Sequence, residues 1–147
     1  MPHTAVRLLV LFAATAVLAA CGQEAKPVAA KTDGDQIAVR EAVADFLVAF
    51  AVGDGEAACS LMTDEAIAGV VEDGVERSAE EAFEVCADVI DDLGEFLEPE
   101  EREQLENPEF TSVEVTGNSA LVGVTYDDTQ IELERTDEGW RLAEGIE

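Results

Sequence analysis

The stretch FTSVEVTGNSALVGVTYDDTQIELERTDEGWRL, residues 110–142, decides the fold class because its apolar side chains alternate with polar ones. Val113 and Val115 alternate ahead of the turn signal Gly117-Asn118, and the same alternation returns three more times after it. Alternation with a period of two predicts half-buried strands, and short turns rich in Gly, Asn and Asp predict hairpins between them. The stretch therefore predicts four antiparallel strands in sequence order.

Upstream of the strands, apolar residues recur at three- and four-residue steps, which is the period of amphipathic helices. The residues Ser78 and Glu81 form a capping box, and Asp54 and Thr63 suit the N-caps of two short helices. Helices are expected at about 35–52, 56–62, 64–73, 78–97 and 99–107. Helices first and strands last predict an α+β domain, with the antiparallel sheet curled over the long N-terminal helices.

The first residues have the pattern of an export signal. Leu8 to Ala20 is an apolar run of 13 residues, which is shorter than the about 20 that a membrane-spanning helix needs. The run ends in Leu18-Ala19-Ala20-Cys21, which resembles the lipobox of bacterial lipoproteins. The resemblance implies cleavage before Cys21, a palmitate-type lipid on its sulfur, and a place at the extracytoplasmic face of the cell membrane. An ordinary signal peptide that happens to contain a cysteine is the alternative.

Removal of the signal, residues 1–20, leaves 127 of the 147 residues. That length suits one domain, residues 35–147, behind a flexible lipid-anchored linker over 21–34. All 34 acidic residues remain with seven of the eight basic ones, so the formal charge is −27. Such a charge repels phosphate backbones and anionic head groups. We therefore expect no nucleic-acid partner and no membrane contact besides the lipid on Cys21.

Several chemistries are excluded by residue type. The one histidine, His3, leaves with the signal, so histidine-based catalysis and histidine metal sites are not expected. No acid cluster has the spacing of a calcium-binding EF-hand loop, and there is no glycine-rich phosphate loop. We therefore expect neither a metal nor a cofactor. Arg135 and Arg141 are expected to face solvent and to pair with neighbouring acids.

Two cysteines remain once Cys21 carries the lipid. An even number of cysteines in an exported chain is typical of disulfide bonding, so Cys59 and Cys86 are expected to be bonded to each other. The alternative is that each is a small buried apolar residue of an amphipathic helix. A redox-active pair is disfavoured because the two lie far apart in sequence, unlike a Cys-x-x-Cys motif.

Several short motifs together resemble one known group. They are Phe46-Leu47 followed by Gly53-Asp54, then 57–63 (AACSLMT), and the terminal Trp140-Arg141-Leu142. They resemble small actinobacterial lipoproteins with a nuclear transport factor 2-like, or SnoaL-like, domain. The resemblance covers 35–147. It implies a cone-shaped half-barrel of the nuclear transport factor 2-like and cystatin-like type, with helices over a concave sheet and often a pocket inside.

Two classes of function remain. The first is a non-catalytic binding or interaction module for a small apolar ligand or a partner protein. Its pocket would be lined by Phe46, Phe50, Tyr126 and Trp140, although each also suits a plain core. The alternative is an isomerase- or hydrolase-type enzyme that uses carboxylates alone. Because histidine is absent and no acid pair stands out, we favour the binding module and assign no catalytic residue.

Overall fold

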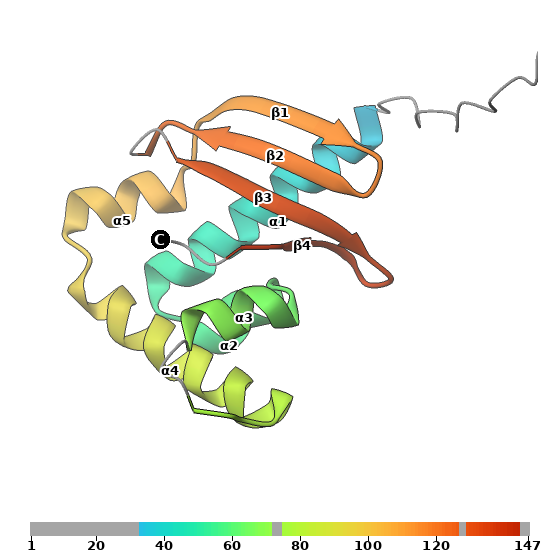
Figure 1. The fold of residues 1–147 in the computed structure, drawn as a ribbon. Helices are drawn as coiled ribbons and strands as arrows, with labels where there is room; N and C mark the ends of the chain where they lie inside the picture. The colour runs from blue at the N-terminus through green and yellow to red at the C-terminus, as the bar shows by residue number, and fades with distance from the viewer. Residues whose placement is uncertain (1–32, 72–74, 127–128, 145–147) are drawn as a thin grey trace, which may run out of the picture.

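A computed structural model describes residues 33–71, 75–126 and 129–144. Within these ranges helices precede strands: α1 (Asp33–Val52), α2 (Gly55–Ser60), α3 (Asp64–Val70), α4 (Ala79–Phe96), α5 (Pro99–Glu106), β1 (Phe110–Thr116), β2 (Ser119–Val124), β3 (Gln130–Thr136) and β4 (Gly139–Leu142) (Figure 1). This order agrees with the α+β class expected from the sequence. The expected signal, Cys21 and most of the linker lie outside the described residues.

Local capping chemistry sets where the helices begin. At the start of α4 the Ser78 hydroxyl accepts a hydrogen bond from the Glu81 backbone N–H at 3.3 Å, and the Glu81 carboxylate accepts one from the Ser78 N–H at 2.9 Å. Asp54 and Thr63 likewise accept backbone N–H bonds at the starts of α2 and α3, at 3.0 and 3.2 Å. These contacts satisfy donors that a helix N-terminus leaves unpaired. The capping residues predicted from the sequence are confirmed.

The strands form one antiparallel sheet in the order β1-β2-β3-β4. Val115 pairs with Ala120, Ala120 with Leu133, and Leu133 with Leu142, so these residues form one row across the sheet. All four side chains are buried, which identifies this face as the one turned to the core. Gly117 has a φ of 63° in the β1–β2 turn, a conformation that glycine adopts without steric cost. The predicted meander is confirmed.

Helix α1 runs diagonally across the buried face of the sheet, and α2, α3 and α4 gather beyond the β4 edge (Figure 1). That edge is paired rather than open. The Thr63 N–H donates to the Leu142 carbonyl at 2.8 Å, and the Leu142 N–H donates to the Leu61 carbonyl at 2.9 Å. The segment between α2 and α3 therefore continues the sheet and brings Met62 into the core, where it is 1% exposed.

Two of the expected apolar stripes differ from the buried faces. Ile37 is 56% exposed because it precedes the buried Val39 by two residues, which places it about 200° away around the helix. On α4 the buried residues are Cys86, Ala87, Ile90 and Gly94. Phe96 lies to one side of that face and is 82% exposed. The helical periodicity of the sequence puts Ile37, Leu93 and Phe96 on apolar stripes expected to face the core, and this expectation is wrong for all three because each is exposed.

Candidate functional site

A small apolar groove lies between three helices. Its volume is about 220 Å³, and its lining comes from α1, the α2–α3 segment, α3 and α4: Phe46, Phe50, Met62, Gly69, Val70, Val89, Ile90 and Leu93. Phe46 and Met62 are almost fully buried and form the floor. Every lining residue is apolar or glycine, so the groove suits an apolar group.

Helical spacing explains how the sequence builds this groove. Phe46 and Phe50 stand one turn apart on α1 with ring centroids 6.3 Å from each other. Val89 and Leu93 stand one turn apart on α4, opposite them. On α3, Gly69 contributes no side chain, and a Cβ placed there would meet nothing within 4 Å. The α3 side of the groove therefore has free space next to Gly69.

The helices around the groove are held together by a covalent bond and a hydrogen bond. Cys59 and Cys86 form a disulfide with a Cα–Cα distance of 6.3 Å, and both residues are fully buried. The Gly55 N–H donates to the Asp91 carboxylate at 2.6 Å, so α2 meets α4 a second time. The Cys59–Cys86 disulfide predicted from the sequence is therefore confirmed, and it joins α2 to α4, which forms one wall of the groove.

The four aromatic residues expected to line one pocket are divided between two parts of the fold. Phe46 and Phe50 line the groove. Tyr126 is half-buried just after β2, and Trp140 is buried on β4 beneath the Arg135 guanidinium, whose carbon lies 4.7 Å from the ring centroid. The aliphatic part of the groove lining was not assigned from the sequence. Its only signal was the helical apolar stripes, which predict a core equally well.

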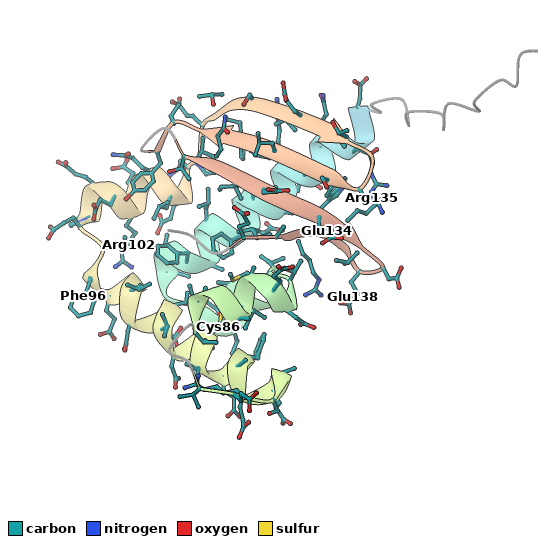
Figure 2. All side chains as sticks on the ribbon, in the orientation of Figure 1. Cys86, Phe96, Arg102, Glu134, Arg135 and Glu138 are labelled. Carbon is teal, nitrogen blue, oxygen red and sulfur yellow. A yellow bond between two sulfur atoms is a disulfide. The ribbon has the colours of Figure 1, made fainter. Side chains whose placement is uncertain are left out.

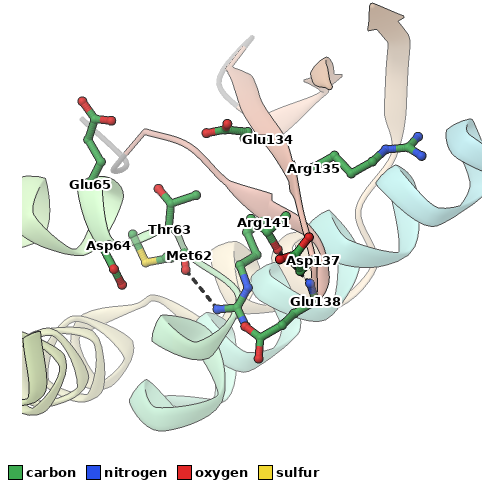
Figure 3. A pocket seen from close by; sticks show the side chains of 10 residues that line it. Met62, Thr63, Asp64, Glu65, Glu134, Arg135, Asp137, Glu138 and Arg141 are labelled. Carbon is green, nitrogen blue, oxygen red and sulfur yellow. Dashed lines mark hydrogen bonds and ion pairs between the residues drawn. The ribbon is translucent and has the colours of Figure 1, made fainter. Parts of the chain in front are cut away.

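A second, larger hollow of about 540 Å³ is polar. It lies between the start of α3 and the β3–β4 hairpin, and Figure 3 shows its lining side chains. Its Arg141 guanidinium donates to the Ser60 and Met62 carbonyls at 2.6 and 3.3 Å and pairs with Glu138 at 2.5 Å. Since the central cation is engaged by the protein itself, this hollow is the weaker candidate for a ligand site. The pairing of Arg141 with a neighbouring acid agrees with the sequence analysis.

Charged groups lie outside the core. Among the described residues, every buried side chain is apolar. Hydrogen bonds from the Ser78 backbone and hydroxyl lower the pKa of Glu81, whose carboxylate serves as a helix cap and is not among the groove-lining residues. In the described part of the chain, no group of three or more acidic, cysteine or histidine residues is placed to hold a metal ion.

Comparison of the chain with protein-family models, with curated proteins and with solved structures finds no match. Within the described ranges, no helix combines the length and the apolar character needed to cross a membrane.

Proposed function

We propose that this protein is a lipid-anchored extracytoplasmic lipoprotein that works as a non-catalytic binding module. The observation that carries the proposal is the apolar groove between α1, α3 and α4, which would hold a small apolar ligand or an apolar part of a partner protein. The short apolar run that ends at Cys21 supports the location.

The nuclear transport factor 2-like, cystatin-like cone is the finer fold that we propose. It is supported by the long helix α1 lying across a four-stranded antiparallel sheet. Fully buried side chains from both layers, among them Val43, Val122 and Leu133, occupy the space between α1 and the sheet. In this fold the groove among the helices, rather than the space beneath the sheet, would be the place for a ligand.

A binding role fits the groove better than the carboxylate enzyme. General acid–base catalysis needs a titratable group within hydrogen-bond reach of the substrate. The lining of the groove offers only aliphatic, aromatic, thioether and glycine groups. Such a lining provides contact area and excludes water, which is what an apolar ligand or side chain requires.

The test uses the mature chain, residues 21–147, with Cys21→Ser so that no lipid competes for the groove. The neutral dye Nile red serves as the probe, and its fluorescence is titrated with protein. Leu93→Glu is compared with Val52→Glu as a matched control, because these exposed apolar residues are 47% and 54% exposed and only Leu93 lines the groove.

We expect Leu93→Glu to weaken dye binding at least about tenfold, because a lost apolar side-chain contact is worth roughly 1.5 kcal/mol or more. Val52→Glu should leave the dye affinity unchanged. Absence of dye binding by the unmodified groove, or equal loss in both variants, would overturn the proposal.

A further inference from the structure

The apolar surface of the groove continues beyond it along α4. Leu93 lines the groove and is 47% exposed, and Phe96 follows three residues later on the same side of the helix. Figure 2 shows Phe96 at the end of α4 nearest α5, with its side chain directed away from the body of the protein. It is 82% exposed. A large aromatic side chain next to an apolar groove forms one continuous surface of the kind that marks interaction sites.

Acidic side chains border this surface. Asp88 and Asp92 precede Phe96 by eight and four residues, so the three side chains form one row along α4. Both acids are exposed, as is Glu95. An occupant of the groove that also covers Phe96 therefore meets negative charge along one side.

Three of the described arginines are directed to groups other than Asp88 and Asp92. Arg102, the cation nearest in sequence to Phe96, donates to the Gly94 carbonyl at 2.9 Å. Arg135 pairs with Asp35, and Arg141 holds the carbonyls that precede α3. None of these three arginines is paired with Asp88 or Asp92, and both acids are exposed to an external cation.

The size of the groove decides between a ligand and a protein segment. Pockets for drug-sized ligands occupy about 300–1,000 Å³. This groove, at about 220 Å³, is smaller than that and would cover only part of such a ligand, whereas one or two apolar side chains would fill it. An amphipathic helix delivers such side chains at intervals of three, four and seven residues, and its flanks carry the charges.

We propose that the groove, together with Phe96 and the acid row of Asp88 and Asp92, receives a basic amphipathic helix of a partner protein. This inference rests on the proposed function and names its partner class. Apolar side chains of the partner would enter the groove and cover Phe96, and its Lys or Arg side chains would face the acids. An anionic lipid surface is repelled by those acids, and a second copy of this chain carries the same charge.

Three synthetic peptides of about 18 residues, long enough for several helical turns, test the inference. The first is amphipathic with Leu on one face and Lys on the other, the second has the same composition in an order that spreads Leu around the helix, and the third has Glu in place of Lys. Binding to the mature Cys21→Ser chain is followed by fluorescence anisotropy at about 0.15 M ionic strength. We expect the first peptide to bind, the second to bind at least about tenfold more weakly, and the third not to bind.

Matched variants locate the peptide on the protein. Phe96→Ser should weaken the first peptide at least about tenfold, whereas Ile37→Ser, another exposed apolar residue on a helix, should not change its affinity. Asp92→Asn should weaken binding several-fold and reduce its salt dependence. The exposed Glu114 on β1 supplies the control Glu114→Gln, which should have neither effect.

Equal binding of the first two peptides, or equal effects of Phe96→Ser and Ile37→Ser, would reduce the interaction to unspecific attraction and overturn the inference. Dye binding that depends on Leu93 without any peptide binding would leave the proposed function standing and refute the partner class. Absence of both dye binding and peptide binding would refute the proposed function and the partner class together. A dimer in analytical ultracentrifugation that Phe96→Ser dissociates would assign the surface to a second copy instead.

Discussion

Replacing Cys59 and Cys86 together by alanine tests how much the disulfide stabilises the fold. The bridge closes a loop with a sequence separation of 27. In the chain-entropy treatment, a loop of this length restricts the unfolded chain by roughly 3.5 kcal/mol at 25 °C. A small domain has a total stability of about 5–15 kcal/mol, so the double variant should remain folded but lose a large part of its margin.

The structure indicates that this loss arises mainly in the unfolded state. Helix α2 would still pack directly on α4 without the bridge, because a Cβ placed on Gly55 would lie only 2.0 Å from the Ala87 carbonyl oxygen. The hydrogen bond from the Gly55 N–H to Asp91 would also remain. We therefore expect the double variant to keep the groove and its affinity for the neutral dye.

Thermal and urea unfolding, followed by circular dichroism, measure the effect. For a domain of this size 1 kcal/mol corresponds to about 4 °C, so the melting temperature should fall by roughly 15 °C. Wild-type protein reduced and kept in reductant without alkylation serves as the control and should melt close to the double variant. A fall of less than about 4 °C, or a loss of dye binding in the folded double variant, would refute the reasoning.

Four further outcomes are expected. Cys21→Ser in the full chain should release the protein from the membrane fraction or leave it unprocessed, as fractionation and intact mass would show. Sodium chloride should raise the melting temperature because it screens repulsion among the excess acids, whereas a flat response would show that their repulsion is negligible. Gly94→Ala should destabilise the fold by about 1–3 kcal/mol in urea titrations, since its Cβ would lie 2.7 Å from the Gly53 Cα, whereas the control Gly69→Ala meets open space and should not destabilise it. Glu81→Gln should lower the melting temperature at neutral pH. The folded pKa of Glu81 lies below its usual value of 4.5, so the extra stability of the wild-type protein is fully present above that pH. This difference in stability should disappear as the pH falls through the lowered pKa.

The parts of the fold predicted from the sequence are those that depend on local chemistry. Ser78 and Glu81 satisfy each other's backbone groups within one turn, so the start of α4 needs no information from the rest of the chain. Gly117 and the alternating residues around it likewise fix a hairpin with their own conformational preferences.

The groove could not be predicted from the sequence because it depends on which parts of the helix surfaces are left uncovered when the helices pack together. Val89 and Ile90 are adjacent in sequence, and Ile90 is buried while Val89 is half-buried on the groove wall. The same uncertainty explains Phe96, whose apolar character suits a core or an exposed patch equally. Only the rotation of α4, set by the close approach of Gly94 to Gly53, determines which residues of the helix remain uncovered.

The arginines show why a charge count alone misjudges this surface. None of the described helices has a basic residue in its last turn. Arg102 instead donates to Gly94 near the end of α4, and Arg141 donates to Ser60 at the end of α2 from 81 residues away. Both guanidinium groups thus satisfy carbonyls that a helix C-terminus leaves unpaired. Because these two guanidinium groups are directed at backbone carbonyls, neither is paired with Asp88 or Asp92, and those two exposed acids remain accessible to a basic partner.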